Sequence, residues 1–217
     1  MKVDVIIPTL CPGREFVSLL ERLEEQSAEL NRIIVMNTEK EGAPVPWDEP
    51  GFFSRHPKVT VKSVKKEGFD HGGTRNAGVS LSDAEIFICM TQDALPADRE
   101  LVRCLTGALG QGERIAAAYA RQLPKADCGR IERFTRQFNY PETSSVKGQA
   151  DLARLGIKTY FCSNVCAAYR RDVFRRLGGF CCPTIFNEDM IYAAGAVKAG
   201  YEIAYAADAR VFHSHNY

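Results

Sequence analysis

One glycine-rich segment of the chain combines residue types that could hold a phosphorylated ligand. Residues 67–78 read EGFDHGGTRNAG and lie between an apolar run and a helix-like pattern. Gly72 and Gly73 would let backbone N–H groups approach a phosphate at a helix N-terminus. Arg75 could bind two oxygens of a diphosphate, or a base carbonyl, through its planar guanidinium. Taken alone, the segment is explained equally well as a glycine-rich turn with a surface arginine.

A single carboxylate stands directly after another apolar run, in the segment Thr-Gln-Asp-Ala at residues 91–94. An aspartate at the end of a buried strand is costly unless it is paired or bound to a metal. Asp93 could therefore bridge Mg²⁺ or Mn²⁺ to a diphosphate, because these hard cations prefer oxygen ligands. The alternative is that Asp93 caps the helix that follows, which is a common role for aspartate.

Two further groups of ionisable residues occur near the C-terminus. Glu188 and Asp189 open a segment rich in alanine and glycine that suits a helix. The helix dipole alone favours acids in a first turn, so this pair does not by itself indicate catalysis. His213 and His215 are two residues apart, and on an extended segment they point to the same side, where either could reach a metal. A terminal tail that binds nothing is the alternative.

Apolar runs and helical stripes alternate along the first half of the chain, and these elements must position the candidate residues. Strands are predicted at residues 3–9, 32–37, 59–64, 85–91, 115–120, 159–169 and 201–212, and helices at 13–29, 72–81, 98–109, 172–177 and 188–198. Residues 39–57 and 121–158 are predicted to be loops, the second a mobile loop or an insert. The alternation predicts an α/β protein with an open, mostly parallel twisted sheet and helices on both faces. Ligands bind such sheets beyond the carboxyl ends of the strands, where Thr9, Asn37 and Asp93 fall.

The overall composition excludes several classes of protein. Of the 217 residues, 45% are hydrophobic and 25% charged, and the net charge is +1, which suits a globular protein and does not indicate nucleic-acid binding. No run reaches the ~20 apolar residues of a membrane helix, and the N-terminus does not read as a signal peptide. The eight cysteines are then expected to be reduced thiols in a cytoplasmic protein. Their spacing does not match common zinc sites, and no Gly-x-Gly-x-x-Gly follows the first strand.

The order of the motifs is more informative than any one of them. VDVIIPTL, IIVMNT, FDHGGTRNAG, a strand that ends in TQDA, GGF followed by NED, and finally HSHNY together resemble glycosyltransferase family 2 of the GT-A fold. The resemblance covers essentially the whole chain, and FDHGGTRN, TQDA and HSHNY are most similar to members that transfer rhamnose from a dTDP-linked donor. It implies an inverting enzyme that moves a sugar, expected to be rhamnose, from a dTDP- or UDP-sugar to a glycan or lipid-linked acceptor in cell-surface polysaccharide synthesis.

The resemblance also implies a role for each candidate residue. Asp189 matches the catalytic base, and Glu188 is expected to support it. Contacts to the nucleotide sugar are expected from Thr9, Asn37, His71, Gly72, Arg75, Gln92 and Asp93. The family's Asp-x-Asp metal motif is reduced to one acid, because Thr91 occupies the first position.

The expected cofactor is a divalent metal, Mg²⁺ or Mn²⁺. By the same resemblance it would be held by Asp93, by His213 or His215, and by the diphosphate of the donor. With one acid in the motif, most of its ligands would come from the donor.

The chain is expected to be a single GT-A domain over residues 1–217, with a nucleotide-binding half at about 1–95 and an acceptor-side half at about 96–217. Members of the family usually continue beyond HSHNY, so the acceptor-side half is expected to be truncated, together with a part that would hold the protein at the inner face of the membrane. A catalytically inactive nucleotide-sugar-binding core is therefore one alternative. A sugar-phosphate nucleotidyltransferase is another, although it would carry a glycine-rich, basic loop where this chain has TLCPGR.

Overall fold

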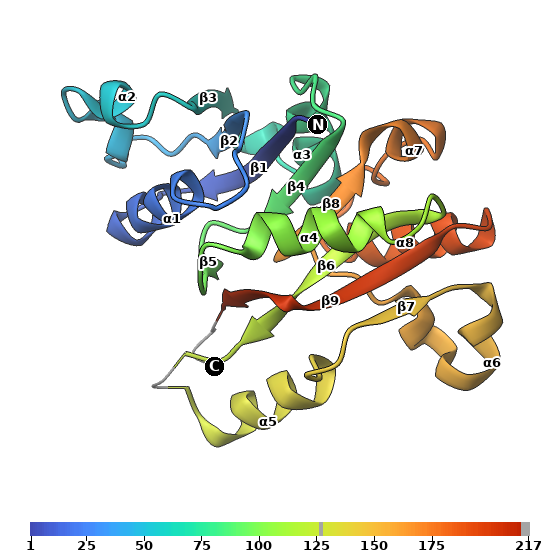
Figure 1. Ribbon diagram of the computed structural model, residues 1–217. Coiled ribbons are helices and arrows are strands. Elements are labelled where there is room, and N and C mark those ends of the chain that lie inside the picture. Colours follow the sequence, from blue (N-terminus) through green and yellow to red (C-terminus); the bar gives the residue numbers. More distant parts are fainter. Residues whose placement is uncertain (126–127, 214–217) are drawn as a thin grey trace.

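The computed structural model describes residues 1–125 and 128–213, which form a nine-stranded sheet covered by helices (Figure 1). The strands are β1 (Val3–Leu10), β2 (Arg32–Thr38), β3 (Val59–Val64), β4 (Ile86–Met90), β5 (Leu95–Pro96), β6 (Ile115–Leu123), β7 (Ser145–Lys147), β8 (Cys166–Arg170) and β9 (Glu202–Phe212). The helices are α1 (Arg14–Glu24), α2 (Phe52–Arg55), α3 (His71–Ser80), α4 (Leu101–Gly110), α5 (Arg130–Asn139), α6 (Leu152–Leu155), α7 (Arg171–Arg176) and α8 (Glu188–Lys198). Short 3₁₀ helices lie at Pro46–Asp48, Lys66–Gly68, Gln149–Asp151 and Gly156–Tyr160.

Side chains of the central strands point alternately to the two faces of the sheet and so divide the core into two layers. On β1, Val5 and Ile7 pack with α1 and α4, whereas Ile6 packs on the other face with α3 and α8. Successive residues of a strand point to opposite faces, so a strand covered on both sides reads as a continuous apolar run. All five residues of β4 are buried for this reason. The predicted α/β sheet with helices on both faces is confirmed.

The order of the strands creates the crevice in which a ligand is expected. The sheet runs β3-β2-β1-β4-β8-β6-β9-β5, and β7 also pairs with β9. The first four strands in this order are parallel, and β8 is antiparallel to both of its neighbours. The chain moves outward from β1 to β3 and then returns to β4 on the other side of β1. Parallel sheets bind ligands where the strand order reverses, which here lies between the carboxyl ends of β1 and β4.

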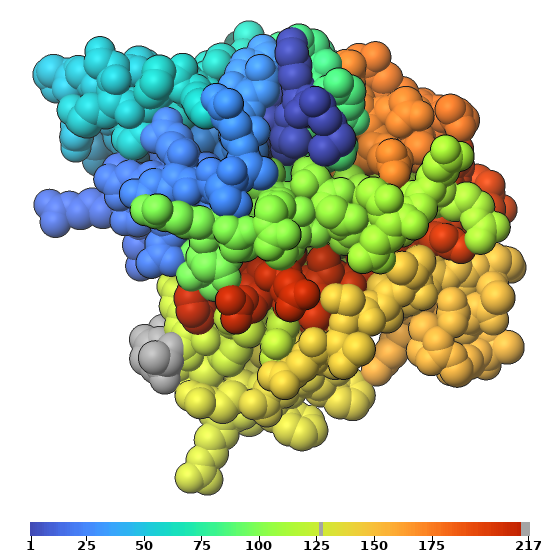
Figure 2. Space-filling view, viewed as in Figure 1, coloured from blue at the N-terminus to red at the C-terminus, as the bar shows by residue number. Residues whose placement is uncertain are grey.

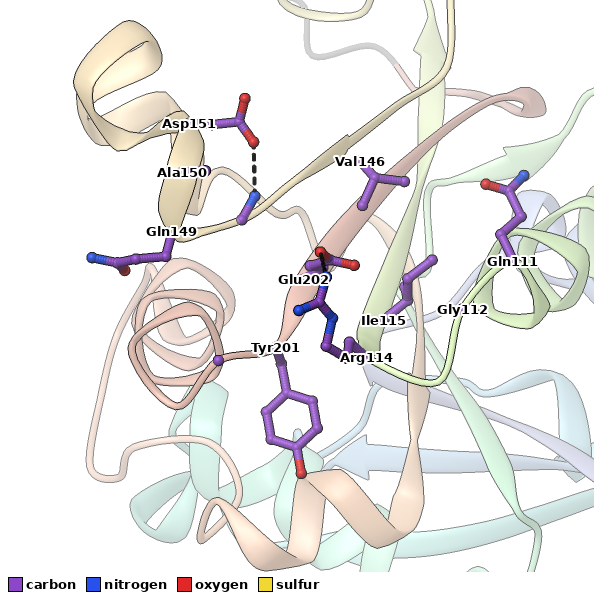
Figure 3. A pocket seen from close by; sticks show the side chains of 12 residues that line it. Gln111, Gly112, Arg114, Ile115, Val146, Gln149, Ala150, Asp151, Tyr201 and Glu202 are labelled. Atoms are coloured by element: carbon purple, nitrogen blue, oxygen red, sulfur yellow. Dashed lines mark hydrogen bonds and ion pairs between the residues drawn. The ribbon is translucent and has the colours of Figure 1, made fainter.

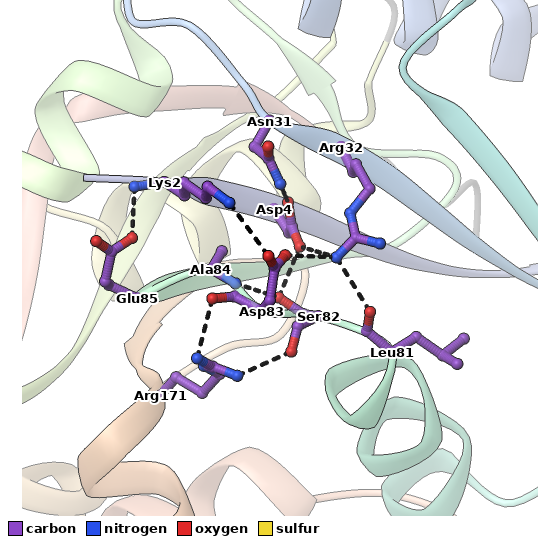
Figure 4. Close-up of polar contacts among 10 residues, drawn as sticks. All are labelled: Lys2, Asp4, Asn31, Arg32, Leu81, Ser82, Asp83, Ala84, Glu85 and Arg171. Carbon is purple, nitrogen blue, oxygen red and sulfur yellow. Dashed lines mark hydrogen bonds and ion pairs between the residues drawn. The ribbon is translucent and has the colours of Figure 1, made fainter.

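A buried carboxylate stabilises the sheet at the amino ends of its central strands (Figure 4). Asp4 of β1 has no exposed surface and accepts hydrogen bonds from the Asn31 amide and the Ser82 hydroxyl, both at 2.7 Å. Arg32 lies 3.3 Å from the same carboxylate. A buried charge is tolerated only when it is paired and hydrogen-bonded. Asp4 therefore joins the amino ends of β1 and β2 to the turn before β4, away from the expected ligand crevice.

The first helix is shorter than its periodicity predicts. It ends at Glu24, more than a turn earlier than expected. The residues that follow bond across the fold instead of continuing the helix: Gln26 Nε2 donates to the Asp98 carbonyl at 2.9 Å, and the Ser27 N–H donates to the Arg99 carbonyl at 2.8 Å. These tertiary partners replace the helical ones.

Residues 121–158 are more regular than predicted from the sequence. They hold the end of β6, then α5, β7 and α6 (Figure 1). The strand predicted from residue 159 begins only at Cys166. The first of these residues lie in a 3₁₀ helix, and the buried ammonium of Lys147 donates to the carbonyl oxygens of Lys158 and Phe161 at 3.2 and 2.7 Å. These bonds hold the intervening segment in a turn.

Candidate functional site

Side-chain amides and a hydroxyl connect the carboxyl ends of β1, β2 and β4. Gln92, just after β4, binds the backbone of Leu10 twice: its Oε1 accepts from the N–H at 2.9 Å, and its Nε2 donates to the carbonyl at 3.1 Å. Thr9 Oγ1 donates to Asn37 Oδ1 at 3.0 Å, and both of these side chains are buried. The structure thus brings the predicted residues Thr9, Asn37 and Gln92 to one edge of the sheet.

The start of α3 is closed by other parts of the protein. Asp70 caps the helix, with its Oδ1 accepting from the N–H of Gly73 at 2.7 Å, while the N–H of His71 donates at 2.8 Å to a carbonyl of the loop before α8. A side chain at Gly72 would lie 2.0 Å from the carbonyl oxygen of Cys181, so close packing of this loop requires glycine. The N–H of Gly73, which the sequence predicts to face a phosphate, is thus already bonded to Asp70.

Arg75 lies in a buried ion pair. Its Nη1 is 3.2 Å from Oε1 of Glu188, and the two side chains are 4% and 5% exposed. The same nitrogen donates to the His71 carbonyl at 3.0 Å, and Arg75 Nε is buried without a hydrogen-bond partner in the described part of the chain. Burial, followed by the positive charge of Arg75, lowers the pKa of His71. Arg75 is therefore the counter-charge of Glu188.

Asp189 lies in the first turn of α8, where its carboxylate is made more basic. Its Oδ2 accepts from the N–H of Asn164 at 2.8 Å, and its Oδ1 accepts from the N–H of Met190 at 2.7 Å. Burial raises the pKa of Asp189; the N–H of Asn164 opposes this rise, and the charge of Glu188 adds to it. A carboxylate with a raised pKa is a stronger base, which is the property a general base requires.

Asn164 connects the carboxylates of Glu188 and Asp189. The sequence analysis did not identify this residue. This residue is 2% exposed, and in addition to the bond from its N–H to Asp189, its Nδ2 donates to Oε1 of Glu188 at 2.8 Å. Its own Oδ1 accepts from the Tyr169 hydroxyl at 2.7 Å. The one available signal was an amide in the otherwise weakly polar run FCSNVCAA, which is expected to be paired when buried.

Asp93 and His213 face each other beyond the ends of β4 and β9. Asp93 Oδ2 lies 3.4 Å from His213 Nε2. Burial opposes ionisation of Asp93, but the hydrogen bond with His213 helps to hold its pKa well below the usual value. On the other side of the ring, His213 Nδ1 lies 3.0 Å from Gln122 Oε1 and 3.1 Å from Arg136 Nη2. An ionised carboxylate that faces an imidazole is a donor set that fits Mn²⁺ or a similar divalent cation.

His215, the other predicted metal ligand, lies outside the described residues. Within residues 1–125 and 128–213 there is no group of three or more histidine, cysteine or acidic side chains that could hold a metal. A cation bound by Asp93 and His213 would therefore need further oxygen ligands, such as those of a diphosphate.

One chain of polar contacts connects the Asp93–His213 pair with Asp189. Gln122 reaches His213 through its Oε1 and donates from Nε2 to Ser163 Oγ at 3.0 Å. Ser163 precedes Asn164, whose N–H binds Asp189. The contacts run from Asp93 through His213, Gln122, Ser163 and Asn164 to Asp189.

Two cavities differ in their relation to these residues. A cavity of about 160 Å³ lies between α1 and residues 92–95, beside Gln92 and Asp93. A cavity of about 610 Å³ lies at the amino ends of β6 and β9, where Arg114 and Glu202 form an ion pair at 2.8 Å (Figure 3). The larger cavity contains none of the predicted site residues, so we place the candidate site at the carboxyl ends of β1, β2 and β4, beside the smaller cavity.

No helix in the part of the chain that the structure describes is long and apolar enough to cross a bilayer.

Comparison with known proteins points to one family. Residues 4–178 match the model of a family described as Glycosyl transferase family 2. Over 218 residues the chain is 40% identical to the O-antigen chain rhamnosyltransferase RfbN of Salmonella typhimurium, covering 100% of this chain and 68% of that protein. Over 155 residues it is 44% identical to the O-antigen chain rhamnosyltransferase WbaN of Salmonella anatum, covering 71% of this chain and 49% of that protein. The matches thus span about two thirds and one half of these relatives.

A solved structure shares the fold. The mannosyltransferase PcManGT from Pyrobaculum calidifontis, in complex with GDP-Man and Mn²⁺, aligns with a TM-score of 0.71 over 98% of this chain and 56% of that one. The sequences are 19% identical, so this likeness concerns the fold alone. It confirms the predicted GT-A architecture.

Proposed function

Because this chain belongs to glycosyltransferase family 2, we propose that it transfers a sugar from a nucleotide diphosphate to an acceptor hydroxyl with inversion at the anomeric carbon. The relatives named above are O-antigen chain rhamnosyltransferases, so the proposed donor is dTDP-rhamnose, with a UDP-sugar as the alternative. The proposed acceptor is a glycan or lipid-linked glycan of a cell-surface polysaccharide. The observation that carries the proposal is the polar chain from Asp93 to Asp189, which joins the proposed metal ligands to the proposed base.

Asp189 is the proposed general base. The acceptor oxygen attacks the anomeric carbon from the face opposite the nucleotide, its new C–O bond forms as the bond to the diphosphate breaks, and Asp189 takes the hydroxyl proton. The raised pKa of Asp189 favours this transfer. Glu188 is held in the pair with Arg75, so the two adjacent acids have different roles.

Asp93 and His213 are the proposed metal ligands. A bound Mg²⁺ or Mn²⁺ would neutralise charge that develops on the leaving diphosphate. Gln122 and Arg136 orient the His213 ring from its other side, as outer partners of metal-bound histidines do. The Mn²⁺ in the similar mannosyltransferase structure supports this proposal.

The nucleoside is proposed to bind between the ends of β1, β2 and β4. Asn37 carries both a donor and an acceptor and could therefore recognise a base edge. His71, Gly72 and Arg75 are proposed to meet the donor from α3. Arg75 would make this contact from within its ion pair, since Glu188 already takes one of its nitrogens.

Asp189→Asn tests the proposal directly. It should leave dTDP affinity nearly intact and lower transfer, or donor hydrolysis where no acceptor is known, by ~10²–10⁴-fold. Asp172→Asn is the matched control, because Asp172 also lies in the first turn of a helix but its side chain is 70% exposed. NMR of the product from the wild-type protein should show an inverted anomeric configuration. A fully active Asp189→Asn variant, or a product of retained configuration, would overturn the assignment.

The proposed place of action is the cytoplasm at the inner face of the membrane, where a lipid-linked acceptor would be available. Fractionation of cells that produce the protein tests this: recovery with the cytoplasmic membrane is expected, and recovery outside the cytoplasmic compartment would overturn it.

A further inference from the structure

Helix α5 has the reverse of the usual amphipathic arrangement. Its apolar residues Ile131, Phe134 and Phe138 are 85%, 69% and 62% exposed, while the side chains of Glu132 and Arg136 are only 9% and 13% exposed. A surface helix normally turns its apolar stripe to the core and its charges to water. The three apolar residues, which we call the α5 stripe, follow the spacing i, i+3, i+7 and so lie along one side of the helix.

Polar contacts on the inner side fix this orientation. Arg136 donates to Gln122 Oε1 and lies 3.1 Å from His213 Nδ1, and its Nε is 3.7 Å from Glu132. A rotation that buried the α5 stripe would break the contacts of Arg136 with Gln122 and His213 and would expose His213, which is buried. The exposure of the α5 stripe is therefore built into the fold.

The surroundings of the α5 stripe are positively charged. Two charged residues of α5, Arg130 and Arg133, lie at the surface, and both are cations. The acid of the helix, Glu132, is turned inward. Lys158, from the 3₁₀ helix after α6, places its Nζ 4.2 Å from the centre of the Phe138 ring. The α5 segment, yellow in Figure 2, forms an outer border of the molecule in that view.

The size of the stripe decides between a protein partner and a lipid surface. A ten-residue helix is about 15 Å long, so one stripe of three side chains offers much less than the ~800 Å² per partner that a stable protein interface buries. A few inserted apolar side chains beside cations are, in contrast, enough for reversible binding to an anionic bilayer.

We propose that α5 docks on an anionic membrane, with Ile131, Phe134 and Phe138 at the boundary of headgroups and acyl chains and with Arg130 and Lys158 among the headgroups. This assigns a membrane-facing surface within the described chain and is independent of which sugar is transferred. Since Arg136 contacts His213 on the inner side of α5, docking would bring the candidate site close to the bilayer.

Vesicle co-sedimentation tests the proposal. The wild-type chain should bind vesicles that contain phosphatidylglycerol and should bind phosphatidylcholine vesicles about tenfold less. Ile131→Ser/Phe134→Ser/Phe138→Ser should lower the partition coefficient by about 100-fold, since three partly buried apolar side chains are lost. Arg130→Glu/Lys158→Glu should lower it by about tenfold, with the difference disappearing at high salt.

Phe53→Ser/Leu81→Ser is the matched control, because both residues are exposed, at 50% and 43%, and lie away from α5, Phe53 in α2 and Leu81 just after α3. It should bind vesicles like the wild type. Equal binding by the control and the triple serine variant would overturn the proposal, as would binding of the wild type to neither vesicle. If the stripe instead mediates self-association, sedimentation without lipid will show a dimer that the triple variant lacks, which also overturns it. Calorimetry with dTDP on the same variants separates failure of the membrane proposal from failure of the proposed transfer function. The α5 variants should bind dTDP like the wild type whatever their binding to vesicles.

Discussion

Replacing Glu188 by glutamine would remove one charge from a buried ion pair and change little else. The carboxylate of Glu188 lies 3.2 Å from Arg75, and glutamine keeps an Oε1 that can accept from Asn164. The variant leaves the buried Arg75 guanidinium without its nearest carboxylate partner. Breaking a buried pair in this way costs about 3–5 kcal/mol. Because one kcal/mol corresponds to roughly 2–4 °C in the Tm of a domain of this size, Tm should fall by about 10 °C.

Urea unfolding followed by tryptophan fluorescence would measure this change. Trp47 is the single tryptophan of the chain and packs against Phe16 and Phe52, with ring centroids 6.4 and 6.3 Å apart. Its emission therefore reports on the core between α1 and the segment that contains α2. An Arg75→Met/Glu188→Met variant should recover much of the lost stability, because removing both charges avoids the unpaired cation.

A second ion pair in the same protein is a matched control. Glu25 and Arg99 also meet at 3.2 Å, but their side chains are 59% and 70% exposed. Exposed pairs contribute little, so Glu25→Gln should cost less than about 1 kcal/mol. If Glu188→Gln costs no more than Glu25→Gln, then Arg75 does not depend on Glu188 and the reasoning is refuted.

Three other changes test neighbouring parts of the structure. Arg75→Lys keeps the charge but loses the planar guanidinium, so calorimetry should show dTDP affinity about tenfold lower; unchanged affinity would leave Arg75 only its role beside Glu188. Binding of dTDP should be tighter with Mn²⁺ than with EDTA, and Asp93→Asn should abolish the difference; equal affinity in the wild type would reject the metal site. Burial lowers the pKa of Lys147 to about 8. Between that pH and the unfolded value of about 10.4, the unfolded chain binds more protons than the folded one, so the contribution of Lys147 to stability rises with pH. Lys147→Met should remove this rise, and parallel stability curves for the two proteins in urea unfolding from about pH 7 to about pH 10 would contradict it.

The central strands were predictable because burial on both faces leaves a direct mark on the sequence. The strand at Val59–Val64 and the helix at Glu188–Lys198 occur with the predicted bounds, and β1, β2 and β4 differ by a residue or so at their ends. Helix α5 was missed although Ile131, Phe134 and Phe138 recur at helical spacing, because polar and charged residues fill the rest of this segment and made it read as a loop.

The candidate site could be located from the sequence, but its internal contacts could not. Strand ends collect at one edge of a parallel sheet, so Thr9, Asn37 and Asp93 were expected there. The pairing of Arg75 with Glu188 and the bridge through Asn164 join segments that are far apart along the chain. No local pattern encodes which buried charge meets which partner.

The sequence by itself determined the α/β class, the family and the acids available for catalysis, because these depend on residue types and short-range order. Only the tertiary structure decided how those acids differ. Adjacent residues of one helix meet different surroundings: Glu188 is neutralised by Arg75, whereas Asp189 is buried with backbone N–H partners and a raised pKa. Burial and the nearest charge determine the basicity of a carboxylate, and both depend on packing between segments that are distant in the chain.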